Sequence, residues 1–116
     1  MNKEILMVMR WLENSKSVSL EDLKQNEVDA SAAYYGSRAA YYDSRDDPTS
    51  SAAYFARTTA YHTAFEAACA ACNASECDTC HVVNYTAQAA HAVGEYFKYS
   101  KENEQDYIYH LENTNA

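Results

Sequence analysis

The chain has 116 residues, the length of a single domain (residues 1–116), and its 9 basic and 17 acidic side chains give a net charge of −8. This acidity argues against direct binding to DNA or RNA, because neutralising phosphates requires a basic face. No stretch reaches transmembrane length and the opening residues lack the order of a signal peptide, so we expect a cytoplasmic protein with reduced cysteines and no membrane contact.

Two helix starts are visible in the first third of the chain. A helix is predicted over residues 3–13, with Asn2 as its N-cap. A second helix is predicted from residue 20 to about residue 42, because Ser19 and Asp22 have the spacing of a capping box.

The second helix contains a seven-residue repeat of alanine and tyrosine. It consists of Ala32-Ala33-Tyr34-Tyr35-Gly36-Ser37-Arg38 followed by Ala39-Ala40-Tyr41-Tyr42-Asp43-Ser44-Arg45. Seven residues make two helical turns, so the large and small side chains form stripes along the helix. With 20 Ala and 11 Tyr against five Leu and two Ile, we expect a core in which alanine packs against tyrosine.

Three further helices are predicted. Asp47 as N-cap and Pro48 at the first helical position start the third helix. A break is expected near residues 73–75, where Ser75 would cap a fourth helix that ends near Tyr99, and Asn103 would cap a short last helix. The predicted buried stripes of the three long helices are Leu23, Ala30, Tyr34 and Tyr41, then Tyr54, Tyr61, Phe65, Ala68 and Cys72, then Val82, Tyr85, Ala89, Val93 and Tyr96.

Together these elements predict an all-α fold, an antiparallel bundle of three long helices of about 23 residues with short N- and C-terminal helices. The alternative is one continuous helix over residues 49–99, which would need a partner chain to cover it. Trp11 and the segment 7–9 also need covering, either by the bundle or by a second copy, so a homodimer is possible.

The four cysteines form two Cys-x-x-Cys pairs. Cys69, Cys72, Cys77 and Cys80 could hold zinc as four thiolates. The four residues that separate the pairs make a short spacing, and the first pair lies in an alanine run that favours helix. We therefore expect the cysteines to be small packing residues and no metal or other cofactor to be bound.

A catalytic constellation is not recognisable, so the sequence predicts a protein that is not an enzyme. His62 and Glu66 share a helix face at i and i+4 and could act as an acid–base or metal pair, but no partner residue has catalytic spacing. Cys77 to His81 matches the haem-attachment pattern of exported proteins, and export is not indicated.

Charge and aromatic content instead point to binding surfaces. Residues 58–97 contain no Lys or Arg but four acids, so the third and fourth helices could present an acidic face to a basic partner. Arginine beside tyrosine could also contact a ligand. The candidate partner-binding residues are Glu66, Glu76, Asp78, Tyr35, Tyr42, Arg38 and Arg45.

The opening residues 1–12, the segment 17–19, the Ala/Tyr helices and the final stretch 95–98 resemble small uncharacterised accessory proteins of tailed bacteriophages. The resemblance implies a protein made in the host cytoplasm that binds a host protein, such as a defence or nucleic-acid-processing factor, and inhibits or retargets it. Two other functions stay open: a sponge that sequesters a nucleotide signal between Tyr and Arg side chains, and an acidic mimic of DNA.

Overall fold

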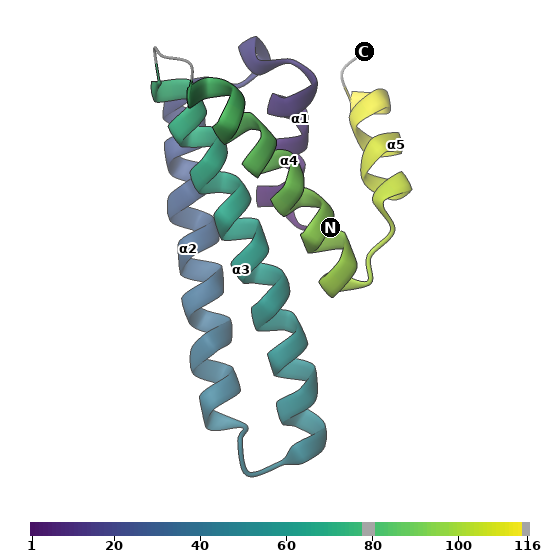
Figure 1. Cartoon of the computed structure of the whole chain (residues 1–116). Helices are drawn as coiled ribbons and strands as arrows, with labels where there is room; N and C mark the ends of the chain where they lie inside the picture. The colour runs from purple at the N-terminus through teal and green to yellow at the C-terminus, as the bar shows by residue number, and fades with distance from the viewer. Residues whose placement is uncertain (78–80, 115–116) are drawn as a thin grey trace.

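The computed structural model describes residues 1–77 and 81–114, and this part of the chain is all-α (Figure 1). The three long helices pack on one another, with α3 between α2 and α4, and α1 contacts all three. This confirms the predicted fold class in outline. In chain order the elements are α1 (Lys3–Glu13), the short 3₁₀ helix η1 (Ser15–Ser17), α2 (Leu20–Asp43), α3 (Pro48–Glu76), α4 (His81–Ser100) and α5 (Glu104–Thr114).

The helix starts follow from local capping chemistry. At four of the five predicted N-caps, a side-chain oxygen accepts a backbone N–H from the first turn, which satisfies a donor that has no partner within the helix. The donor–acceptor distances are 2.9 Å for Asn2 with Ile5, 3.1 Å for Ser19 with Asp22, 3.1 Å for Asp47 with Thr49 and 2.9 Å for Asn103 with Gln105.

The predicted break between the third and fourth helices is present, but its predicted position at residues 73–75 is wrong. α3 continues to Glu76, and Cys77 is the first residue with extended backbone, at φ −92° and ψ 129°. Ser75 does not cap a new helix; it lies within α3, where its Oγ accepts the indole N–H of Trp11 at 3.0 Å. Because α3 ends at Glu76 and α4 begins at His81, the alternative of one helix over residues 49–99 is wrong too. The three long helices have 24, 29 and 20 residues rather than equal lengths.

The core lies at the end of the molecule where α1 meets α2, α3 and α4. Seven alanines of α3 are buried there, in one core cluster with large side chains of α1, such as Ile5, Val8 and Trp11. The expectation of an alanine–tyrosine core is therefore wrong for most of the tyrosines, since only Tyr96 and Tyr107 are buried. Trp11 is covered by the fold itself, at 4% exposed. The buried alanines of α3 are Ala60, Ala64, Ala67, Ala68, Ala70, Ala71 and Ala74.

The Ala/Tyr repeat lies outside this core. Residues 31–59, the end of α2, the connecting turn and the start of α3, form a two-helix extension that reaches beyond α4 (Figure 1). Ser37 is the only buried residue in this extension. Tyr34, Tyr41, Tyr54 and Tyr61 are half-buried, with the Tyr41 ring 5.6 Å from that of Phe55. The repeat thus lies in an extension of two helices, and aromatic side chains such as Tyr35, Tyr42 and Phe55 are exposed there.

Helix α5 is tied to the N-terminus through Tyr107. The backbone N–H of Asn2 donates to the Tyr107 hydroxyl at 2.6 Å, and that hydroxyl and the one of Tyr96 both donate to the Glu102 carboxylate. Burial, reinforced by Glu102, raises the pKa of Tyr107 to about 12 and raises the pKa of Tyr96 as well. Both phenols are donors at neutral pH, and their hydrogen bonds, together with the contact of the Tyr107 ring with Phe97, join α5 to α1 and α4.

Candidate functional site

An open groove of about 780 Å³ lies between α3 and α4. Each helix contributes a histidine and a glutamate spaced four residues apart, so both members of a pair lie on one helix face. On α3, Nδ1 of His62 is 3.1 Å from the Glu66 carboxylate, and on α4, Nε2 of His91 is 3.8 Å from the Glu95 carboxylate. The packing of α3 on α4 brings the two pairs to the same groove.

The groove is also lined by aromatic side chains and by side-chain amides. Phe65 and Tyr99 supply aromatic surface, and Asn73 and Gln88 supply side-chain amides. Among the described residues that line the groove, none is Lys or Arg, in keeping with the absence of basic residues from positions 58–97 of the sequence. Carboxylates and aromatic faces without a competing cation suit a Lys or Arg side chain, because both attract positive charge.

Cys69 also lines the groove, as a protonated thiol. Its Sγ donates to Oε1 of Glu27 at 3.4 Å, and burial together with the Glu27 charge raises the pKa of the thiol to about 12. A thiol with so high a pKa carries almost no thiolate at neutral pH, and the thiolate is the nucleophilic form. The groove therefore offers the carboxylates of Glu66 and Glu95 for binding, and the Cys69 thiol that lines it is not activated as a nucleophile.

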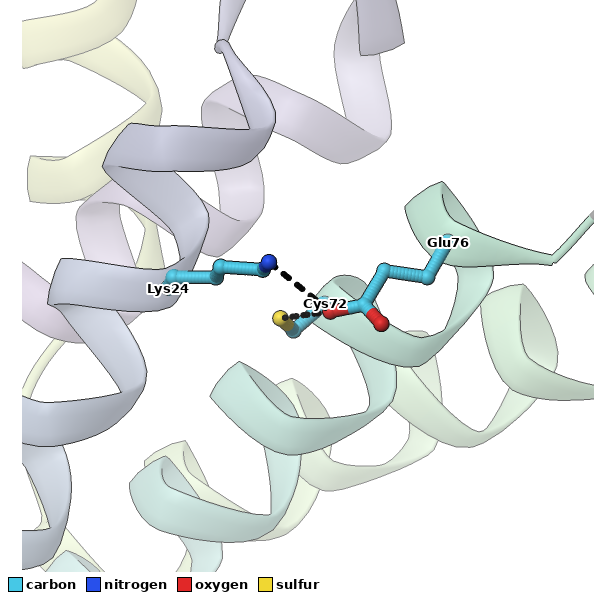
Figure 2. Close-up of polar contacts among 3 residues, drawn as sticks. All are labelled: Lys24, Cys72 and Glu76. Atoms are coloured by element: carbon cyan, nitrogen blue, oxygen red, sulfur yellow. Dashed lines mark hydrogen bonds and ion pairs between the residues drawn. The ribbon is translucent and has the colours of Figure 1, made fainter.

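Glu76 lies in a different environment from Glu66. Figure 2 shows the Cys72 thiol and the Lys24 ammonium group pointing to the same carboxylate oxygen of Glu76, with Lys24 reaching across from α2. The Cys72 thiol donates to the Glu76 carboxylate at 3.4 Å, and Nζ of Lys24 is 3.9 Å from the same oxygen. Glu76 borders a second, shallower groove between α2 and α3. Glu66 and Glu76 are therefore not one acidic patch, and Asp78, the third member of the predicted face, lies outside the described residues.

The cysteines do not converge on a metal site within the described part of the chain. Among residues 1–77 and 81–114, no three His, Cys, Asp or Glu side chains are placed to hold a metal ion. Cys72 is buried in α3, and burial raises the pKa of its thiol to about 12, with Glu27 and Glu76 adding to the shift. Cys77 is half-buried just after α3, and Cys80 lies outside the described residues.

We expect the protein to keep its fold when metal is removed. The thiols of Cys69 and Cys72 are held protonated by burial and by carboxylate neighbours, an environment unlike that of a thiolate ligand. Far-UV circular dichroism and the melting temperature should not change when EDTA is added. Loss of helical signal on chelation, together with one zinc per chain by elemental analysis, would contradict this prediction.

The other four predicted contact residues share the exposed face of α2 and the turn after it. Tyr35 and Tyr42 are 53% and 47% exposed. The guanidinium carbons of Arg38 and Arg45 lie 5.6 Å and 5.4 Å from the centre of the Tyr42 ring, within cation–π distance. The structure thus brings these four residues together, and it separates them from the α3/α4 groove.

Sequence reasoning found half of the groove. The spacing of His62 and Glu66 predicts a pair, and Glu95 is one of the four acids of residues 58–97, whereas His91 and Tyr99 are not predicted as site residues. The signal for the second pair was present, because His91 and Glu95 repeat the spacing of His62 and Glu66. The two pairs line one groove because of the way α3 packs on α4, and the spacing of residues within each helix does not determine that packing.

Comparisons with known proteins found no matching family model, no matching curated protein and no matching solved structure. Within the residues that the structure describes, no helix combines the length and apolar character needed to span a membrane. The function is therefore inferred from the grooves and surfaces of this chain.

Proposed function

We propose that this chain is a phage accessory protein of the host cytoplasm that binds a host protein and inhibits or retargets it, without catalysing a reaction. The observation that carries the proposal is the α3/α4 groove, where the His62–Glu66 and His91–Glu95 pairs line one recess. In this proposal the three long helices form an antiparallel bundle that holds the groove open in solution. The phage origin is supported by the resemblance of the N-terminal segment.

The chemistry of the groove favours a basic segment of the host protein. A Lys or Arg side chain would find the carboxylates of Glu66 and Glu95 for its charge, and the rings of Phe65 and Tyr99 for its alkyl stem. The Glu66 side chain is 57% exposed and the Glu95 side chain 29%, so one carboxylate is available to an approaching charge and the other is partly screened from water. Basic surfaces that bind nucleic acid are one class of partner that fits this arrangement.

A lysine-rich fluorescent peptide tests the chemistry directly. We expect it to bind the protein more tightly than a peptide in which glutamine replaces every lysine, and to bind more weakly as salt is raised, because the attraction is electrostatic. The double variant Glu66→Gln with Glu95→Gln removes both groove charges and should weaken binding by about three- to tenfold. Fluorescence anisotropy measures both affinities.

A matched control separates the groove from the overall charge. Glu104→Gln with Glu112→Gln removes two charges from exposed positions of α5, and this variant should bind the lysine peptide like the parent. Equal weakening by the two double variants would mean that net charge alone attracts the peptide, and the groove proposal would fail.

In capture experiments from host lysate, a co-purifying nucleotide would favour the sponge function, and displacement of the partner by DNA would favour the DNA mimic.

A further inference from the structure

The outer face of α2 carries an exposed apolar seam. Val28, Tyr35 and Tyr42 recur every seven residues and are 61%, 53% and 47% exposed. Ala32 and Ala39 lie between them at four-residue steps and are also exposed. This alternation of three- and four-residue steps is the heptad pattern of a helix that packs against another helix. The five residues are called the α2 seam below.

None of the five seam residues is buried in the fold of the single chain. The buried positions of α2 are Leu23, Asn26, Ala30 and Ser37, which face α1 and α3 on the opposite side of the helix. Exposed apolar residues are common singly, but an ordered row from Val28 to Tyr42, about 21 Å long at 1.5 Å per residue, is the kind of surface that marks an interface.

Charged residues border the seam, and the two borders have opposite sign. Asp29 and Asp43 directly follow the seam residues Val28 and Tyr42, and Asp22 has the same heptad position one repeat before Asp29. Lys24 and Arg38 follow the other edge. All five are exposed; Lys24 is 59% exposed although its Nζ is 3.9 Å from Glu76.

The signs and positions of these charges favour a second copy of α2 in the parallel orientation as the partner. When two copies of α2 lie parallel, a residue on the basic edge faces the residue five positions later on the acidic edge of the other copy. Arg38 then faces Asp43 of the partner subunit, and Lys24 faces Asp29 of the partner subunit, each pair occurring twice by symmetry. In the antiparallel arrangement the basic edges face each other and so do the acidic edges, which is repulsive.

We propose that two copies of this chain form a parallel, two-fold symmetric dimer through the α2 seam. The tyrosines of each copy cover the alanines of the other, and the Arg38–Asp43 pairs fix the orientation. The α3/α4 groove lies on other helices, so dimer formation leaves it open in both copies. The dimer would present two grooves to a partner.

A charge-exchange experiment tests both the surface and the orientation. The parent protein should be a dimer at micromolar concentration by sedimentation equilibrium. Arg38→Glu alone places Glu against Asp43 of the partner subunit and Asp43→Lys alone places Lys against Arg38 of the partner subunit, so each should weaken the dimer about tenfold or more. A mixture of the two variants restores opposite charges at both pairs and should form heterodimers about as stable as the parent.

Two further variants test whether the dimer forms through the α2 seam. Tyr35→Glu puts a charge in the seam and should give a monomer, whereas Arg57→Glu, an exposed charge reversal on α3, should leave the dimer unchanged. Circular dichroism must show that each variant is folded. A parent that remains monomeric at high concentration, a dimer that resists Tyr35→Glu, or single variants whose mixture fails to associate would each overturn the proposal. None of these results alters the peptide binding expected of the α3/α4 groove, so the two proposals fail independently.

Discussion

Trp11→Ala is expected to lower the free energy of unfolding by about 3–5 kcal/mol, a large share of the stability of a small domain. The Trp11 side chain is 4% exposed and lies between α1 and the C-terminal end of α3. Its removal leaves a cavity in the core cluster, and it also removes the hydrogen bond to Ser75 at 3.0 Å. Urea unfolding followed by circular dichroism measures the loss.

Two comparison variants show where the effect arises. Trp11→Phe keeps most of the apolar volume and loses the indole N–H, so we expect a cost of about 1–2 kcal/mol. Tyr109→Ala removes an aromatic ring that is 69% exposed on α5 and should change stability by about 0.5 kcal/mol or less. If Trp11→Ala were no more harmful than Tyr109→Ala, α1 would not be packed as described.

Ala71→Leu is expected to destabilise the fold by about 1–3 kcal/mol, although leucine is a good helix former. Ala71 is fully buried in the segment of α3 where alanines allow α1 and α4 to approach closely. The added methyl groups have no free space there, so the neighbouring helices must move apart. Thermal unfolding of the variant measures the effect.

The same substitution at an exposed alanine of α3 is the control. Ala56→Leu lies in the two-helix extension and should change stability by about 0.5 kcal/mol or less. A result in which both variants unfold at the temperature of the parent would show that the alanine face of α3 is not closely packed. A result in which both are equally harmful would point to a general effect of leucine on this helix.

Local chemistry made the helix starts predictable from sequence. A Ser, Asp or Asn cap satisfies backbone donors within its own first turn, so Asn2, Ser19, Asp47 and Asn103 could be found without knowledge of the rest of the fold. The end of α3 was not predictable in this way. Ser75 has the chemistry of a cap, but in the structure its hydroxyl serves Trp11, a residue 64 positions away.

Which face of each helix is buried was harder to predict from the sequence than where the helix begins. Tyrosine at seven-residue spacing fits a core stripe and an exposed seam equally well, because periodicity records a shared face without recording what covers it. The core depends instead on α1, whose few large side chains meet the alanines of α3. Likewise the His62–Glu66 pair was visible in the sequence, and the groove became visible only when α4 placed His91 and Glu95 beside it.

Whether the α3/α4 groove receives a basic segment is tested most directly by zero-length cross-linking. A carbodiimide activates carboxylates, and the amine of a bound lysine then forms an amide with the nearest one. With the lysine peptide bound, mass spectrometry should find the peptide joined to Glu66 or Glu95, and addition of salt should reduce this product. Peptide joined mainly to Glu104, Glu112 or other carboxylates outside the groove, with Glu66 and Glu95 unmodified, would contradict the proposed binding site.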